Sequence, residues 1–279
     1  MTMIKNIYIG CIGLLLATST TAQVKIDRSK APEAGLAPKI NINEPATFTL
    51  ENGLKVFVIE NHKLPKVSFQ LSVDVPLILE GDKIGLSEMA GDMLGAGTTT
   101  KSKSEIDAEI DFIGASLATN SKGIYASGLS KHTDKIMTLM SEIMLSPAFP
   151  VEELEKKKKR AISGLKTVGS NADAIAGQVA SVLNYGVDHP YGEVQTKENV
   201  ENISIDDCKK YYDTYFRPNI SYLVILGDID VKRAKEMTNT YFGTWKSKEV
   251  AVETYNPAIA PKGVRVVFVE KPGAVHSVI

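Results

Sequence analysis

Cysteine and histidine are scarce in this sequence of 279 residues, which contains two cysteines and four histidines. One cysteine, Cys11, lies in an N-terminal apolar stretch that we expect to be removed on maturation, so that only Cys208 remains. A protein with one cysteine cannot form an internal disulfide bond. The chain also lacks an excess of positive charge: its net charge of −1 gives no reason to expect a nucleic acid as a partner.

Residues 1–22 predict a signal peptide. Lys5 supplies a basic start, an apolar run follows over 7–17, and small residues precede Gln23. The run is shorter than the roughly 20 residues that cross a bilayer, and no other stretch is long and apolar enough, so we predict no membrane span. A lipid-modified Cys11 is an alternative, which the very short apolar run before it disfavours. We therefore expect an exported protein, periplasmic or secreted.

The rest of the chain divides by composition. Residues 23–46 hold three prolines and no periodicity, which predicts an extended arm. Residues 47–245 mix strand and helix patterns without strict alternation, which favours an α+β domain with helices packed on a mixed, largely antiparallel sheet. The polar segment 246–263 carries prolines and predicts a linker, and a further strand is expected over 264–269.

The expected elements follow from hydrophobic periodicity and from turn and cap residues. We expect strands over 47–50, 54–59, 67–73, 115–120, 124–130 and 220–226. We expect helices over 86–94, 133–145, 152–164 and 172–185, together with one from Ser104 to Gly114, one from Ser204 and one that ends near Gly243. Capping boxes are predicted at Ser104 with Asp107 and at Ser204 with Asp207.

The helix over 86–94 is the centre of the pattern. Its apolar residues recur at i, i+3, i+4, i+7 and i+8, which is typical of a helix with one face in the core. The opposite face carries Glu88 and Asp92, one turn apart. Further along, the basic run from Lys156 to Arg160 follows three glutamates at a spacing of four residues. This spacing favours intrahelical ion pairs, so we interpret the run as a solvated helix face and not as a site for an anionic partner.

Several short motifs occur in an order and spacing that resemble a known family. They are N-G-L-x-V at 52–56, G-L with M-L-x-x-G-T over 85–98, His-Pro-Tyr at 189–191, Tyr212 with Pro218-Asn219, Gly227-Asp228, and the segment 271–277. Together they resemble the insulinase-like zinc peptidases, which include the mitochondrial processing peptidase subunits. The resemblance covers about residues 47–279.

The resemblance implies a metal site that this sequence lacks. Active members carry H-x-x-E-H in the central helix, and the corresponding positions here are Glu88, Gly91 and Asp92. The family's third ligand, a glutamate, falls near Gly164, and residues 156–172 contain no acid. The resemblance thus implies a non-catalytic subunit with no catalytic, cofactor-binding or zinc-binding residue, and it places the zinc in a partner subunit.

Further expectations follow from the same resemblance. Residues 264–279 would begin a second, similar domain. The partner would be an active, exported zinc peptidase subunit of the same family, and the heterodimer would degrade peptides. Two alternatives remain open: an independent peptide-binding or scaffold protein, and an active zinc metallopeptidase, against which the missing motif argues.

Other sites find less support in the sequence. Glu88 and Asp92 could bind a different metal, but no further ligand is evident, and hard cations require more oxygens than these two side chains offer. The histidines, which we expect to be structural or solvated, have no second histidine at metal-binding spacing; they are His62, His132, His189 and His276. No G-x-S-x-G motif supports a serine hydrolase.

Overall fold

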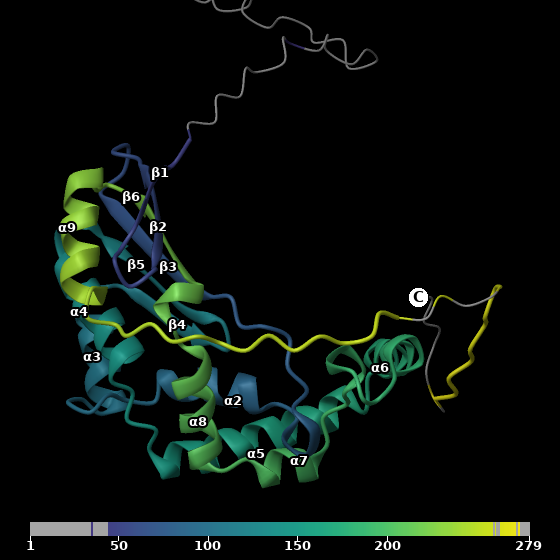
Figure 1. Cartoon of the computed structure of the whole chain (residues 1–279). Coiled ribbons are helices and arrows are strands. Elements are labelled where there is room, and N and C mark those ends of the chain that lie inside the picture. Colours follow the sequence, from purple (N-terminus) through teal and green to yellow (C-terminus); the bar gives the residue numbers. More distant parts are fainter. Residues whose placement is uncertain (1–34, 36–43, 259, 261–262, 272, 274–279) are drawn as a thin grey trace, which may run out of the picture. The chain divides into compact units, whose positions relative to one another are not determined.

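A six-stranded sheet is the framework of the computed structural model, which describes residues 35, 44–258, 260, 263–271 and 273 (Figure 1). The strands are β1 (Ala46–Thr49), β2 (Lys55–Glu60), β3 (Lys66–Val73), β4 (Ser116–Asn120), β5 (Gly123–Leu129) and β6 (Ser221–Gly227). Their order is β1-β2-β6-β3-β5-β4, and within the described residues only β2 and β6 pair in parallel. The prediction of an α+β fold with a mixed, largely antiparallel sheet is confirmed.

One face of the sheet forms the core. Along β3, alternate residues are buried, namely Val67, Phe69, Leu71 and Val73. Helices α4 (Thr133–Leu145) and α9 (Val231–Phe242) cover this face, since α4 packs on β5 and α9 on β2 (Figure 1). The other face carries half-buried side chains such as Phe57, Gln70 and Tyr222. The period of two thus separates a helix-covered face from a more open one.

The remaining helices include α2 (Leu86–Leu94) and α5 (Val151–Val168), between which the candidate site lies. The others are α3 (Lys103–Phe112), α6 (Ala172–Tyr185), α7 (Lys197–Asn202) and α8 (Ile205–Tyr215). Helix α2 contacts α8, β4 and α5. In the part of the chain that the structure describes, no helix combines the length and apolar character that a membrane crossing would require.

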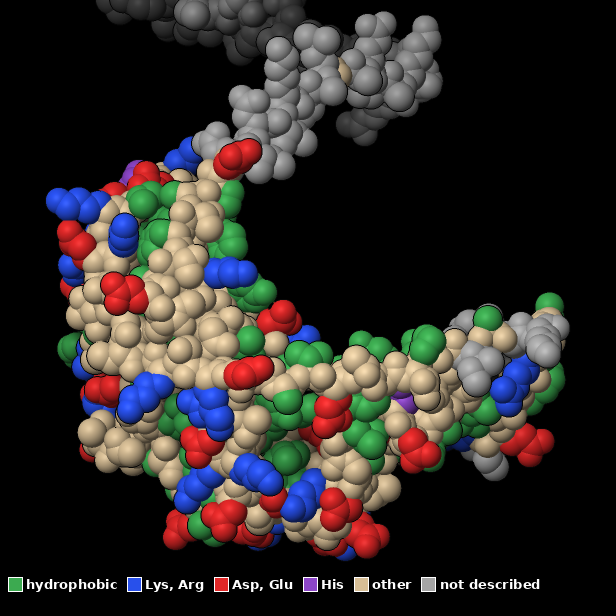
Figure 2. Space-filling view, in the orientation of Figure 1, with side chains coloured by type: hydrophobic (Ala, Val, Ile, Leu, Met, Phe, Trp, Pro, Cys, Tyr) green, Lys and Arg blue, Asp and Glu red, His purple; other side chains and the backbone are tan. Residues whose placement is uncertain are grey.

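The surface of these helices carries charges of both signs. In Figure 2, Lys and Arg side chains alternate with Asp and Glu side chains over the region of α5, α7 and α8. The mixture agrees with the net charge of −1. On the face in view, no extended patch of one sign offers a surface for a polyanion.

Most predicted elements are confirmed, including the helices over 133–145 and 172–185. The predicted cap of α3 is wrong: Ser102 and Glu105 form the capping box, so the helix begins at Lys103 and not at Ser104. Helix α5 continues to Val168, past the predicted end at Gly164. A glycine inside a helix weakens it but does not by itself end it.

The predicted strand over 264–269 is not formed. Within the described residues this segment pairs with no other strand, and its side chains are open to solvent, with Val264 98% and Phe268 88% exposed. A single strand without a neighbour has no ladder of hydrogen bonds to hold it. The signal peptide over 1–22 and most of the arm over 23–46 lie outside the described residues, and the division into a domain, a linker and a second domain stays a prediction.

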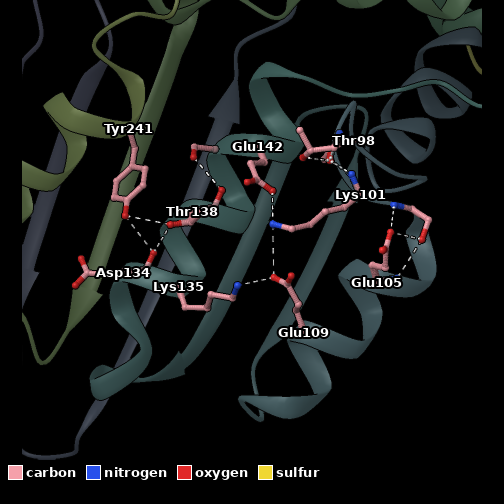
Figure 3. A network of polar contacts seen from close by, with 12 residues as sticks. Thr98, Lys101, Glu105, Glu109, Asp134, Lys135, Thr138, Glu142 and Tyr241 are labelled. Atoms are coloured by element: carbon pink, nitrogen blue, oxygen red, sulfur yellow. Dashed lines mark hydrogen bonds and ion pairs between the residues drawn. The ribbon is translucent and has the colours of Figure 1, made fainter.

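A network of charges fixes the turn that follows α2 (Figure 3). The ammonium of Lys101 lies 2.7 Å from Glu142 on α4 and 3.7 Å from Glu109 on α3, while Lys135 lies 2.7 Å from Glu109. The hydrogen bond from Lys135 lowers the pKa of Glu109, and that to Glu142 raises the pKa of Lys101. The hydroxyl of Thr98 also accepts the amide of Lys101, at 3.0 Å. These contacts join the end of α2 to α3 and α4.

Candidate functional site

The start of α2 is set by a carboxylate and a glycine. Gly85 precedes the helix with a φ of 100°, a left-handed conformation that favours glycine. Its amide donates to one oxygen of Glu80 at 2.5 Å, and the amide of Ser87 donates to the other oxygen at 2.7 Å. Glu80 therefore supplies the acceptor that an N-cap side chain would otherwise give, at the end of the helix where negative charge is favourable.

The two faces of α2 differ as its sequence predicts. Glu88 and Asp92 are exposed, and the buried residues face the core; they are Met89, Ala90, Gly91, Met93 and Leu94. The two carboxylates lie four residues apart and are therefore neighbours on the helix surface. The structure thus keeps them together on one side of the helix.

Between α2 and α5 lies a hollow of about 290 Å³. Its apolar lining includes Met89, Ala161 and Leu165. Glu88 and Asp92 line it from α2, and two cations, Lys157 and Arg160, line it from α5. The hollow therefore carries two acids on one wall and two bases on the other, around an apolar lining.

The charges of this hollow are only partly paired with one another. The ammonium of Lys157 lies 3.6 Å from the carboxylate of Asp92, and the side chains are 18% and 49% exposed. Within the described residues, neither Glu88 nor Arg160 takes part in an ion pair. One carboxylate and one guanidinium are thus left available to a ligand.

The prediction of a wholly solvated face for the run from Lys156 to Arg160 is therefore wrong in part. Lys157 turns toward α2 instead of pairing with Glu153. Glu153 pairs with Lys156 at 2.7 Å, at a spacing of three residues and not four. The cause is tertiary, because Asp92 on the neighbouring helix competes for Lys157.

Gly91, which the resemblance aligns with the base glutamate of H-x-x-E-H, lies against another backbone. A Cβ atom at Gly91 would stand 2.2 Å from the carbonyl carbon of Asn120 and from the amide nitrogen of Ser121, and 2.4 Å from the oxygen of Asn120. These atoms belong to the turn between β4 and β5, so a side chain here would require the hairpin or the helix to move. Glycine is thus required by packing at this position.

Gly164, the position predicted for the third ligand, differs from Gly91 in the space around it. Gly164 lies on α5, lines the hollow and is exposed, and a Cβ atom there would meet nothing within 4 Å. The structure therefore leaves room for a side chain at Gly164 and none at Gly91.

The donor set of the hollow does not fit the zinc ion that active members of the resembled family would bind at this position. A catalytic zinc needs three protein ligands and an open position. The hollow offers the carboxylates of Glu88 and Asp92, and the cation of Lys157 stands next to Asp92. Among the residues that the structure describes, no three His, Cys, Asp or Glu side chains are grouped closely enough to hold a metal ion.

One histidine, which follows β2, contacts an aspartate that follows β6, and this aspartate also contacts a serine that follows β5. Nδ1 of His62 lies 2.8 Å from Oδ1 of Asp228, and the hydroxyl of Ser130 donates to Oδ2 at 2.7 Å. Asp228 thus stands between the other two, whereas a serine hydrolase needs the histidine there. These contacts join three segments that follow strands, and the histidine does not activate the hydroxyl of Ser130 as a nucleophile. The hydrogen bond between His62 and Asp228 raises the pKa of His62 and lowers that of Asp228.

Neither His132 nor His189 lines the hollow between α2 and α5. His189 is buried; its ring stacks on Tyr185 and accepts the amide of Tyr191 at 3.0 Å. His132 precedes α4, and His276 lies outside the described residues. Cys208 is fully buried in α8, and burial raises the pKa of its thiol to about 12, which keeps the thiol protonated and unreactive.

Two features of the site are not predicted by the sequence. One is the capping of α2 by Glu80. This residue lies before a three-residue 3-10 turn, η2 (Gly81–Lys83), and five residues before the N-cap residue Gly85, so it is not at the position where a capping side chain is expected. The other is the participation of Lys157 and Arg160 in the hollow. Their spacing of three residues places them on one side of a helix, and this is the available signal.

Comparisons with known proteins bear on the family and the fold of the chain. Residues 55–182 match the family model of insulinase (peptidase family M16), and residues 202–279 match that of the peptidase M16 inactive domain. A protein of Bacillus subtilis (strain 168), named uncharacterized zinc protease YmxG, is 25% identical over 217 residues, 75% of this chain and 53% of its own. A Helicobacter pylori protein, named non-peptidase homolog YmxG, is 23% identical over 225 residues, 78% of this chain and 52% of its own.

A solved structure shares the fold. The peptidase M16 inactive domain from Pseudomonas fluorescens superimposes with a TM-score of 0.69 at 19% identity, over 77% of this chain and 54% of that one. The present chain spans about half the length of the curated relatives it matches. From its matched residues and its fold, the chain belongs to the insulinase (M16) family of peptidases.

Proposed function

We propose that this chain is the non-catalytic member of a peptide-degrading pair, whose other member is an exported zinc peptidase of the same family. Gly91 is the observation that carries the proposal. It takes the place of the base glutamate, and the backbone of Asn120 and Ser121 occupies the space that a side chain would need. The loss of the base is thus tied to the packing of the β4–β5 turn and is not a single exposed replacement.

The packing of α2 supports a role as a wall. Its buried face is complete, with Met93 and Leu94 fully enclosed, and it contacts α5, α8 and β4. The face that would hold the metal carries Glu88 and Asp92 instead of histidines. A fold kept without its ligands is what a subunit needs when it shapes a chamber around a partner's active site.

The relatives lend independent support. One of them is named a non-peptidase homologue, and the family model matched by residues 202–279 describes an inactive domain. The predicted signal peptide over 1–22 implies that the chain, and hence its partner, works in the periplasm or outside the cell. Zinc and catalysis would then belong to the partner, and peptides would be the substrate of the pair.

Reconstitution tests the proposal. The natural full-length protein is mixed with a candidate exported partner that carries H-x-x-E-H, and turnover of a quenched peptide is followed. We expect the mixture to exceed the sum of the separate proteins, and a partner whose motif glutamate is changed to glutamine to abolish turnover in the mixture.

One observation favours a second candidate, an independent peptide-binding or scaffold protein. The hollow between α2 and α5 presents the charges of Glu88 and Arg160 without a partner subunit. If the zinc peptidase alone is as active as the mixture, pairing is contradicted and this second function is preferred. Turnover by the present chain alone, sensitive to a zinc chelator, would contradict both and indicate an active metallopeptidase.

A further inference from the structure

We propose that the hollow between α2 and α5 binds a short zwitterionic peptide, with the carboxylate of the ligand on Arg160 and Lys157 and its ammonium group on Glu88. This inference concerns the chain alone and does not depend on the proposed pairing.

The arrangement of charge is the first argument. Lys157 and Arg160 lie three residues apart on α5, and Glu88 and Asp92 lie four residues apart on α2, so each pair shares one side of its helix. The two helices therefore face each other with opposite charge across the hollow. A ligand that carries a charge of each sign at its two ends complements both walls at once.

The incomplete pairing within the hollow is the second argument. Lys157 approaches Asp92 at 3.6 Å, a long contact between partly exposed groups. Glu88 and Arg160 line the same hollow, yet within the described residues no ion pair joins them to each other or to another side chain. Planar guanidinium groups bind carboxylates through two parallel hydrogen bonds, which makes Arg160 the principal anchor for a peptide carboxylate.

Size and lining favour a ligand of one or two residues. The hollow measures about 290 Å³, at the lower end of the roughly 300–1,000 Å³ typical of small-molecule sites. Met89, Ala161 and Leu165 give it an apolar lining between the charged walls. An aliphatic side chain can pack there, whereas a metal ion or a phosphate would leave this apolar surface unused.

Calorimetric titration of the full chain tests the proposal with three probes. They are the dipeptide alanyl-leucine, its N-acetylated form and its C-terminal amide. We expect the free dipeptide to bind at millimolar or lower concentration. Either cap should weaken binding about two- to fivefold, the effect of one partly exposed charge pair.

Variants assign the two ends of the ligand. Arg160→Gln should weaken the free and acetylated forms and leave the amide unchanged, and Arg160→Lys should retain part of the affinity. Glu88→Gln should remove the difference between the free and acetylated forms. Lys159→Gln is the matched control, because Lys159 is exposed on the same helix and does not line the hollow; it should bind as the unchanged chain does.

Three results would overturn the proposal. The first is no binding of the free dipeptide at millimolar concentration. The second is equal binding of all three forms, which would show that the termini are not recognised. The third is an equal loss of affinity in Arg160→Gln and Lys159→Gln, which would indicate a non-specific effect of charge. Thermal unfolding of each variant verifies that the chain is folded.

Discussion

Adding one methyl group at Gly91 should destabilise the protein, while adding it at Gly164 should stabilise it. Both glycines lie inside α-helices, Gly91 in α2 and Gly164 in α5. A Cβ atom at Gly91 would stand 2.2 Å from backbone atoms of Asn120 and Ser121. At Gly164 it would meet nothing within 4 Å. The two substitutions are therefore chemically identical and differ in the space around them.

The magnitudes follow from two opposing terms. Replacing glycine by alanine inside a helix contributes about 1 kcal/mol of stability. Overpacking typically costs about 1–3 kcal/mol, and the upper part of this range applies at Gly91 because the obstructing atoms are backbone and not the end of a flexible side chain. We expect Gly91→Ala to lower the free energy of unfolding by about 1–2 kcal/mol and Gly164→Ala to raise it by about 1 kcal/mol.

Chemical denaturation of the two variants and the unchanged chain measures the difference. Thermal midpoints should move in opposite directions, by about 2–4 °C for each kcal/mol in a domain of this size. If both variants shift the midpoint the same way, or if Gly91→Ala is the more stable of the two, the close contact with the β4–β5 turn does not hold and the packing argument fails.

Three further predictions concern pH and proteolysis. The pKa of His62 is raised above 6.5 and that of Asp228 lowered below 3.8, so their ion pair stabilises the fold fully between these values and loses its effect as pH rises through the folded pKa of His62. The free energy of unfolding of His62→Ala should therefore differ most from that of the unchanged chain near pH 5–6 and converge with it at alkaline pH. A difference that does not change with pH would contradict this. Although burial opposes it, hydrogen bonds from Lys83 and Ser204 lower the pKa of Asp207 to about 2; stability should therefore decline as pH falls from about 4 toward 2, and Asp207→Asn should show less of that decline in acid unfolding curves. Limited proteolysis should cut first within 246–263, and first cuts between Gly85 and Gly114 would contradict the predicted domain boundary.

Local patterns are sufficient to predict much of the fold. The alternation along β3 identifies its buried face, and the cap residues Ser204 and Asp207 locate the start of α8. Both signals act between residues that are near each other in sequence, and the structure adds nothing that opposes them. The strand expected over 264–269 fails for the opposite reason, since a strand depends on a neighbour that the pattern of one segment cannot supply.

The candidate site is predictable in its chemistry and not in its packing. The sequence places Glu88 and Asp92 on one side of α2 and shows that histidine is missing there. It cannot show that Gly91 touches the turn at Asn120, because that contact joins residues far apart in the chain. For the same reason the sequence predicts an intrahelical pair for Lys157, whereas Asp92 on another helix lies within reach of it.

Zinc content measured together with peptide turnover tests the central claim, that this chain is a non-catalytic member of its family. The purified chain is compared with the triple variant Glu88→His, Gly91→Glu, Asp92→His by elemental analysis and with a quenched peptide. We expect neither protein to hold one zinc per chain or to cleave the peptide. The variant restores the motif but still lacks a carboxylate near Gly164, and the β4–β5 turn leaves no space for a glutamate side chain in place of Gly91. One zinc per unchanged chain, lost together with peptide cleavage on Glu88→Ala with Asp92→Ala, would contradict the account.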